Sequence, residues 1–563
     1  MESESFPLHF SIFRHESLPE NSTYIRLLEV LDVNHSAKAK VRCKLTTWPV
    51  KQAPLYHAIS YTWGDPVPTE TIIVNNRRME VRQNCEYVLK QAHWHGGSRY
   101  HWVDAICIDQ NNLVEKGNQV AMMGNIFRRA ARVLACVGRH ADDSGFLYET
   151  LATHQRAWNC VDTYSEPRIW KWRTRATVPV LRTRLGLRTS ETRRRLLLAL
   201  KEFSQRPYFS RLWVFQELYH GSKVSFLCGK DHLPSRLLYG LFKSRHWPAL
   251  WCPYSITEFF QGTEANLDPT RLPTTEKLLE VASQPPTTRV PLFILSVIVL
   301  DLFCEDPRDR LYGIISIVDW DSLGITPIIA DYTKKEFEVV VGFFRKLAES
   351  QVNINSHATL SISMYTGSNI VHNLALTATS DGLYDAIKAR QDCPEEEQHT
   401  PRNMKRPLVR VKQACCRGRR ILQEEIDGSF RALFLNSSRI NDGIDVLLPR
   451  QTRAGDWLLS IFPYLGLVAR EQFPGKYAII GKSIIVKRAW ETLSACRERF
   501  DVFLDVEDTV VLLGTRPDFA TFDFGNALRC REYLETRVCG NSDSSYAIRV
   551  VQKSRSWGVF GNG

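Results

Sequence analysis

Three short segments within the first 230 residues carry side chains suited to binding and polar chemistry. Residues 56–65 read YHAISYTWGD, residues 102–110 read WVDAICIDQ, and residues 209–218 read FSRLWVFQEL. Together they supply carboxylates, amides, indoles and a guanidinium. Groups of these types bind flat rings and anions, and they donate or accept hydrogen bonds. If the fold brings the three segments together, they form the rim of a polar site.

The elements around the second segment would provide such a rim. Residues 102–108 form a nearly continuous apolar run, which predicts a strand covered on both faces. Apolar residues at helical spacing predict a helix over residues 115–131, and residues 133–137 predict another strand. Two strands joined by a crossover helix are parallel, with a right-handed connection. We therefore predict an α/β domain built on a parallel sheet.

Ligands of open parallel sheets bind outside the carboxyl ends of the strands. This rule brings together the loops at residues 62–66, 109–112 and 138–140, with a helix from about Ser210 beside them. A carboxylate, an amide, an indole and a guanidinium would then share one rim. The predicted rim residues are Tyr61, Trp63, Gly64, Asp109 and Gln110.

Each of these residues also has a purely structural interpretation. Asp109 could cap the following helix, and Trp63 could belong to the core. Asp104 lies inside an apolar run, so a buried carboxylate there needs a partner, for which we predict Arg211. Most glutamates on helices are solvated, so Glu217 alone gives little evidence of catalysis.

The composition is that of a globular protein with several domains. The chain has 563 residues, 44% of them hydrophobic, and length alone suggests about three or four domains. The strongest apolar run, residues 290–304, is shorter than the roughly 18 residues that a membrane span needs. The start of the sequence lacks a signal-peptide pattern, and the fourteen cysteines show no metal-ligand spacing. We therefore expect a cytoplasmic protein with no membrane span and no metal site.

The net charge of +12 is concentrated in one stretch. Residues 168–195 contain nine Arg and one Lys against one Glu, a local charge of +9. A nucleic-acid-binding arm is one interpretation, which two tryptophans in the stretch would support. A solvated, partly disordered insertion is the other, and we prefer it because no DNA-binding signature accompanies the charge.

Beyond residue 230 the pattern changes twice. Residues 231–385 predict a mainly helical middle region, and residues 386–412 are polar and charged, as a linker would be. Residues 413–563 contain short apolar runs separated by turns, which predict a small β-barrel-like module. The first domain would then span residues 24–230, with the Arg-rich insertion within it.

In this order, the three segments resemble the heterokaryon incompatibility (HET) domain of filamentous fungi. The family pattern has a Tyr-x-Ala-Leu-Ser-Tyr-x-Trp-Gly block, a Trp-Ile-Asp-Ala-x-Cys-Ile-Asn-Gln block and an Arg-x-Trp-x-x-Gln-Glu block. Residues 306–312 and 331–333 resemble stretches that commonly follow HET domains, and two later runs resemble a C-terminal barrel. The matching positions that bear on a site or a structural motif are Tyr61, Trp63, Gly64, Asp104, Gln110, Arg211, Trp213 and Glu217.

HET domains are in turn similar to Toll/interleukin-receptor-like (TIR-like) domains, which have a flavodoxin-like parallel sheet. Residues 213–218 resemble the plant TIR segment whose glutamate is catalytic for NAD+ cleavage, and Glu217 matches that glutamate. The resemblance implies NAD+ as the substrate, with no separate cofactor. Nicotinamide would leave as a neutral group, and Glu217 would stabilise the oxocarbenium-like ribose while Trp63 or Tyr61 stacks on a ring.

The resemblance leads to two competing hypotheses about function. Both describe a fungal self/non-self recognition protein that triggers regulated cell death, with other incompatibility or signalling proteins, and its own copies, as partners. In the first, the chain is an NAD+ nucleosidase that oligomerisation activates. In the second, it is a non-enzymatic adaptor whose HET domain assembles partners. Whether Glu217 lines a pocket distinguishes the two. Specific nucleic-acid binding is the third and weakest interpretation.

Overall fold

The computed structural model describes two compact units, one of residues 1–319 and 328–333 and the other of residues 320–327 and 334–563. The described residues are 11–33, 41–161, 178–244, 248–251, 271–283, 289–292, 295, 298–299, 302–352, 408–410, 416–422, 432–433, 446–448, 452–462, 465–473, 476–485, 496, 498–505 and 546–552.

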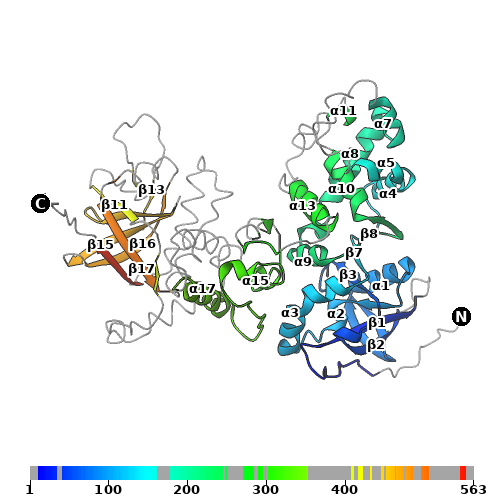
Figure 1. The fold of residues 1–563 in the computed structure, drawn as a ribbon, viewed down its shortest axis with the longest axis horizontal. Helices are drawn as coiled ribbons and strands as arrows, with labels where there is room; N and C mark the ends of the chain where they lie inside the picture. Colours follow the sequence, from blue (N-terminus) through cyan, green and yellow to red (C-terminus); the bar gives the residue numbers. More distant parts are fainter. Residues whose placement is uncertain are drawn as a thin grey trace, which may run out of the picture. The chain divides into compact units, whose positions relative to one another are not determined.

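A nine-stranded mixed sheet forms the centre of the first unit (Figure 1), in the order β5-β4-β2-β1-β6-β3-β7-β8-β9. The four central strands β6, β3, β7 and β8 are mutually parallel, as the strand–helix–strand pattern predicted. Both edges contain antiparallel pairs, so the sheet is mixed rather than purely parallel. The strands are β1 (Tyr24–Asp32), β2 (Arg42–Pro49), β3 (Tyr56–Tyr61), β4 (Thr69–Val74), β5 (Arg77–Arg82), β6 (Tyr100–Trp102), β7 (Arg132–Cys136), β8 (Val224–Cys228) and β9 (Asp231–Pro234).

The central strands are apolar because both of their faces are covered. Every residue of β3 and of β8 is buried. Helices α1 and α9 each contact strands β3 and β7, and helix α3 packs against α9. The helices are α1 (Gln83–His95), α2 (Asp104–Cys107), α3 (Leu113–Arg129), α4 (Ser144–Thr153), α5 (Gln155–Val161), α7 (Val178–Arg184), α8 (Ser190–Ser204), α9 (Leu212–His220), α10 (Ser235–Ser244), α11 (Pro248–Trp251), α13 (Arg271–Ser283) and α15 (Asp309–Tyr312).

The predicted strand over residues 102–108 is wrong beyond its first residue. Strand β6 ends at Trp102, and a single helical turn, α2, begins at Asp104. The turn is closed by the Cys107 N–H, which donates to Val103 O at 2.7 Å. A short apolar run does not by itself distinguish a buried strand from a buried turn, which explains the error.

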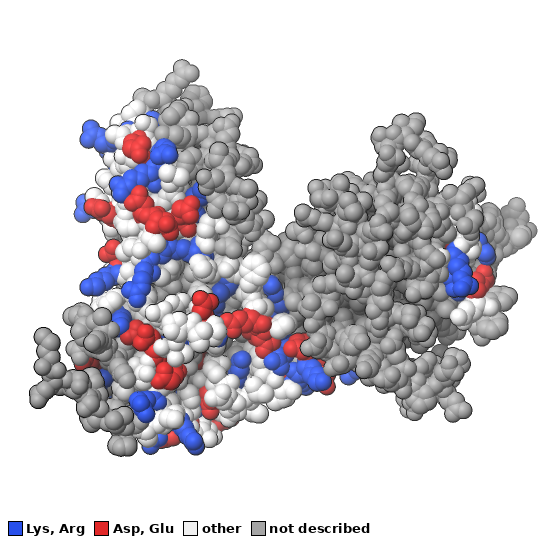
Figure 2. All heavy atoms as spheres, turned by 180° about the vertical axis from the view of Figure 1, so that it is seen from behind, with Lys and Arg blue, Asp and Glu red and all other residues white. Residues whose placement is uncertain are grey.

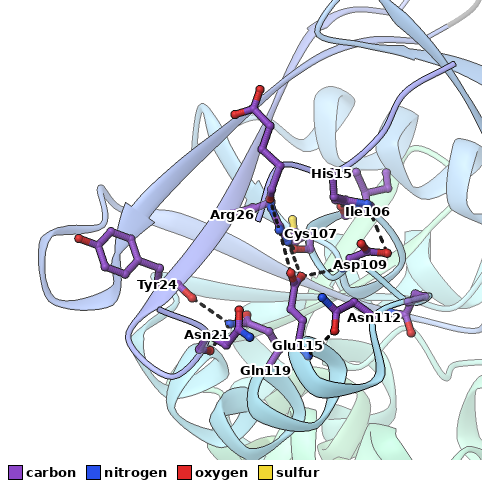
Figure 3. Close-up of polar contacts among 12 residues, drawn as sticks. His15, Asn21, Tyr24, Arg26, Ile106, Cys107, Asp109, Asn112, Glu115 and Gln119 are labelled. Carbon is purple, nitrogen blue, oxygen red and sulfur yellow. Dashed lines mark hydrogen bonds and ion pairs between the residues drawn. The ribbon is translucent and has the colours of Figure 1, made fainter. Parts of the chain in front are cut away.

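A buried ion pair joins helix α3 to strand β1 (Figure 3). The Arg26 guanidinium donates to both carboxylate oxygens of Glu115, at 2.5 and 2.9 Å, and also to Cys107 O at 2.9 Å. Glu115 in addition accepts the Asp109 N–H at 2.8 Å. Asn112 caps the helix by accepting the Glu115 N–H. These bonds hold the loop between α2 and α3 in place.

The Arg-rich stretch is ordered where the structure describes it. Residues 168–177 lie outside the described residues, but helix α7 and the start of α8 cover most of residues 178–195. Arg193 is buried and donates to Leu187 O at 2.9 Å, and Arg195 pairs with Asp143 at 2.7 Å. From residue 178 onward the expected disorder is therefore wrong, because the stretch is helical. Four of its arginines, Arg184, Arg188, Arg194 and Arg195, are exposed, as the solvated interpretation predicted.

The second unit contains helices and an antiparallel sheet. Strand β18 pairs with both β16 and β17, so the pairings β17-β11-β14-β15-β16-β18 return to their starting strand. This confirms the predicted β-rich C-terminal region, while residues 386–407 and 411–412 of the predicted linker lie outside the described residues. The elements are α16 (Trp320–Leu323), α17 (Glu336–Val352), β10 (Leu408–Arg410), β11 (Cys416–Arg420), β12 (Ala432–Leu433), β13 (Val446–Leu447), β14 (Trp457–Phe462), β15 (Leu465–Phe473), β16 (Lys476–Ile485), β17 (Glu498–Asp505) and β18 (Tyr546–Gln552).

Candidate functional site

A cavity of about 760 Å³ opens at the carboxyl ends of strands β3 and β7 in the first unit. Its position follows the rule for ligand sites in open α/β sheets, and its volume is typical of small-molecule sites. Of the predicted rim residues, Tyr61, Trp63, Gly64 and Gln110 line it. Asp104, Tyr208, Arg211 and Trp213 also line it.

The turn after strand β3 forms one side of the cavity. Gly64 has a φ of +74°, and a Cβ there would lie 2.7 Å from Asn84 Nδ2, so the turn requires glycine. Asn84 donates to Thr62 O at 3.1 Å, and Arg82 donates to Gly64 O at 2.7 Å. The Arg82 guanidinium also lies over the Trp63 ring, 5.1 Å from its centroid. The indole therefore has a fixed orientation at the cavity wall.

Asp104 stands beside Trp63 in the half-buried first turn of α2. Its Oδ2 accepts the Trp63 Nε1–H at 2.8 Å, and its Oδ1 accepts the Ala105 N–H at 2.7 Å. Burial raises the pKa of Asp104, while Arg211 and the Trp63 hydrogen bond act against that rise. The predicted partner Arg211 is near enough to act electrostatically, but within the described part of the chain the two form no ion pair.

Asp109 does not line the cavity. Its carboxylate accepts the Asn111 N–H at 3.1 Å and lies 3.8 Å from His15 Nδ1. Gln110, in contrast, lines the cavity while its amide donates to Asp104 O at 3.0 Å. Asp109 thus forms a local turn, but the predicted helix cap is wrong, because Asn112 caps α3 instead. Gln110 connects the rim to α2.

Glu217 lies behind the cavity wall rather than in it. Its side chain is 3% exposed, and it accepts a short hydrogen bond from Ser60 Oγ. Ser60 in turn is 2.7 Å from the hydroxyl of Tyr208, which lines the cavity. Burial raises the pKa of Glu217 to about 7, although Arg211 and Ser60 oppose the rise. A Tyr–Ser–Glu chain of hydrogen bonds thus connects the cavity to a buried carboxyl group.

Another part of the wall comes from residues 303–306, Asp309 and Tyr332, which were not among the predicted site residues. Phe303 is joined to the start of α9: its N–H donates to Ser210 O at 2.6 Å, and its carbonyl accepts the Leu212 N–H at 2.8 Å. Asp309 accepts hydrogen bonds from Trp213 Nε1 at 2.9 Å and from the Tyr332 hydroxyl at 2.6 Å. The only sequence signal was that residues 306–312 and 331–333 resemble stretches that follow HET domains.

Neither a metal site nor a helical membrane span is found in the described residues. No group of three or more His, Cys, Asp or Glu side chains there is arranged to hold a metal ion. None of the described helices combines the length and the apolar character needed to cross a bilayer. On the face drawn in Figure 2, acidic and basic side chains are intermingled over the first unit.

The fold and the cavity define an α/β domain with a small-molecule-sized site at its strand ends. Comparison with known proteins then identifies the domain. Residues 56–217 match the family model described as "Heterokaryon incompatibility protein (HET)". The chain therefore contains a HET domain, and the resemblance seen in the three segments is confirmed.

One similar curated protein is the heterokaryon incompatibility protein 6, OR allele, of Neurospora crassa. It is 27% identical over 380 residues, which cover 57% of this chain and 51% of that protein. This chain thus spans about half the length of that relative. No solved structure matches the chain.

Proposed function

We propose that this protein acts in fungal self/non-self recognition and triggers regulated cell death through its HET domain, with the strand-end cavity as a binding site for NAD+. The cavity is the observation that carries the proposal, because it brings Tyr61, Trp63 and Arg211 together around about 760 Å³. The family match and the name of the Neurospora relative support the biological role. We assign the protein to the cytoplasm, with other incompatibility or signalling proteins and its own copies as partners.

The four parallel strands at the centre of the sheet support a TIR-like, flavodoxin-like arrangement, and with it NAD+ cleavage as the reaction. Loss of nicotinamide leaves positive charge on the ribose, which a nearby carboxylate stabilises. Glu217 has the required carboxylate, but it does not line the cavity. Only the hydrogen bonds through Ser60 and Tyr208 connect it to the cavity. Direct action of Glu217 on the ribose therefore requires Tyr208 to move aside.

NAD+ turnover by the purified full chain tests this proposal. We expect nicotinamide release by the wild type, reduced about a hundredfold or more in Glu217→Gln, since an electrostatic group in an active site contributes on this scale. Glu202→Gln is the matched control, because Glu202 is exposed on α8 and does not line the cavity. Expression in a fungal host, with nicotinamide and viability measured together, relates turnover to death. Killing by a wild type that consumes no NAD+ would exclude the enzymatic function.

The alternative is a non-enzymatic adaptor, which two observations favour. Glu217 is buried behind the cavity wall rather than exposed within it. At the cavity lining, Phe303 is 61% exposed and Val67 is 72% exposed, as contact residues for a partner would be. In this case Glu217→Gln kills as the wild type does, while Phe303→Ser reduces both self-association and killing.

A further inference from the structure

Arg211 differs from Arg206 and Arg308, two other arginines near the cavity, in the contacts of its guanidinium. Arg206 donates to Val137 O and Arg139 O, at 2.9 and 3.0 Å. Arg308 pairs with Asp306 at 2.7 Å. Arg211 lines the cavity, and among the described residues its guanidinium has no hydrogen-bond or ion-pair partner, although its charge lowers the pKa values of Asp104 and Glu217.

The backbone of Arg211 is nevertheless firmly held. Residues on either side of it are hydrogen-bonded to Phe303, and its own N–H donates to Tyr208 O at 3.4 Å. Helix α9 begins at the next residue, and its body is buried against the sheet. A guanidinium offers five N–H donors in a planar fork that matches phosphate and carboxylate geometry. A half-buried guanidinium on a fixed backbone, with these donors unused, is suited to an anion of the ligand.

Asp104 gives the same cavity a negative group in a fixed position. Its two hydrogen bonds, from the Trp63 indole and the Ala105 N–H, hold the carboxylate without neutralising it. An anion without any positive group would be attracted by Arg211 and repelled by Asp104. A ligand with both an anionic group and a cationic ring satisfies both side chains.

We propose that Arg211 binds a phosphate of a dinucleotide ligand and that Asp104, held by Trp63, faces its positively charged ring. This assignment rests on the proposed function and adds to it the residue that binds each part of the ligand. Tyr61 and Tyr208 also line the cavity. Cleavage is not required for this binding mode, so it is compatible with either the enzyme or the adaptor.

Binding of two partial ligands to the full chain tests the assignment by calorimetry. ADP-ribose carries the phosphates without a cationic ring, and nicotinamide riboside carries the cationic ring without a phosphate. We expect Arg211→Gln to weaken ADP-ribose about ten- to a hundredfold, the usual range for charge-assisted hydrogen bonds, and to leave nicotinamide riboside unchanged. Asp104→Asn should do the reverse. Nicotinamide release is monitored in the same samples, so that turnover does not distort the affinity.

Three controls make the result decisive. Arg236→Gln removes the same charge from an exposed position on α10 and should bind both ligands as the wild type does. Arg211→Lys keeps the charge and should recover part of the ADP-ribose affinity, and melting curves verify that each variant is folded. ADP-ribose binding that is unchanged in Arg211→Gln overturns the assignment alone. A wild type that binds neither partial ligand nor NAD+ overturns the proposed function, and the assignment with it.

Discussion

At the scale of single residues, burial decides which acidic and basic groups carry a charge. Burial raises the pKa values of both Glu217 and Asp104, but only Asp104 lines the cavity. Glu217 accepts a hydrogen bond from Ser60, and burial raises its pKa to about 7. A carboxyl group with such a pKa is neutral in part at cellular pH, which lowers the cost of burying it.

Histidines on the central strands provide a pH-dependent contribution to stability. Burial lowers the pKa of His57 to about 4 and that of His101 to about 3, and neighbouring histidines lower both further. The rings of these two residues lie 5.8 Å apart, and the Nδ1 atom of each is buried without a hydrogen-bond partner in the described structure. A protonated imidazole in this position would be a buried charge without compensation.

We predict that acid destabilises the first unit through His57 and His101. Their folded-state pKa values lie below the unfolded value of about 6.5, so the unfolded chain binds more protons between about pH 6.5 and pH 4. Stability is therefore present above pH 6.5 and is lost as the pH falls through this window. In His101→Gln the fall in melting temperature between pH 7 and pH 4.5 should be smaller than in the wild type. An equal fall in both proteins would show that other groups cause the acid sensitivity.

At the scale of elements, two connections hold the site together. The Arg26–Glu115 pair joins β1 to α3. Hydrogen bonds of Phe303 and Asp309 join the cavity wall formed by residues 303–306 and 309 to residues 210–213 at the start of α9. Burial alone would raise the pKa of Glu115, but hydrogen bonds from Arg26 and from the Asp109 N–H bring it below its ordinary value. A Cβ at Gly117 would lie 2.6 Å from Ala330 O, so α3 packs directly on the segment that leads to Tyr332.

Glu115→Gln should destabilise the protein strongly, because it leaves the buried Arg26 guanidinium without a countercharge. Breaking a buried pair on one side typically costs about 3–5 kcal/mol. Urea unfolding of the full chain, followed through tryptophan fluorescence, measures the change. Asp143→Asn is the matched control: it removes an exposed pair with Arg195, and asparagine tolerates the left-handed φ of 61° at this position. A similar midpoint shift in the two variants would contradict a special role for the buried pair.

At the scale of the whole molecule, the compact unit is larger than the region that matches the family. The match covers residues 56–217, while the sheet also needs β1 and β2 on one side and β8 and β9 on the other. Strand β6 pairs with both β1 and β3, and Arg26 of β1 is the partner of Glu115. The matched region alone therefore leaves core strands unpaired and a buried carboxylate without its cation.

We predict that a fragment of residues 56–217 does not fold, whereas a fragment of residues 11–333 does. The longer fragment contains the complete sheet and both walls of the cavity. Circular dichroism melting curves distinguish the two: a cooperative transition is expected for residues 11–333 and none for residues 56–217. A cooperative transition in the shorter fragment would show that β1, β2, β8 and β9 are dispensable for the fold.

The sequence by itself indicated the HET domain, the parallel centre of the sheet and four of the residues that line the cavity, Tyr61, Trp63, Gly64 and Gln110. These features depend on local signals: ordered motif blocks, apolar strands, and a glycine at the turn after Trp63. The tertiary structure alone decided that Asp104 begins a helical turn, that Glu217 lies behind Ser60 and Tyr208, and that residues 303–309 close the site. Contacts between segments a hundred residues apart depend on how elements pack, and no local pattern of residue types encodes that packing.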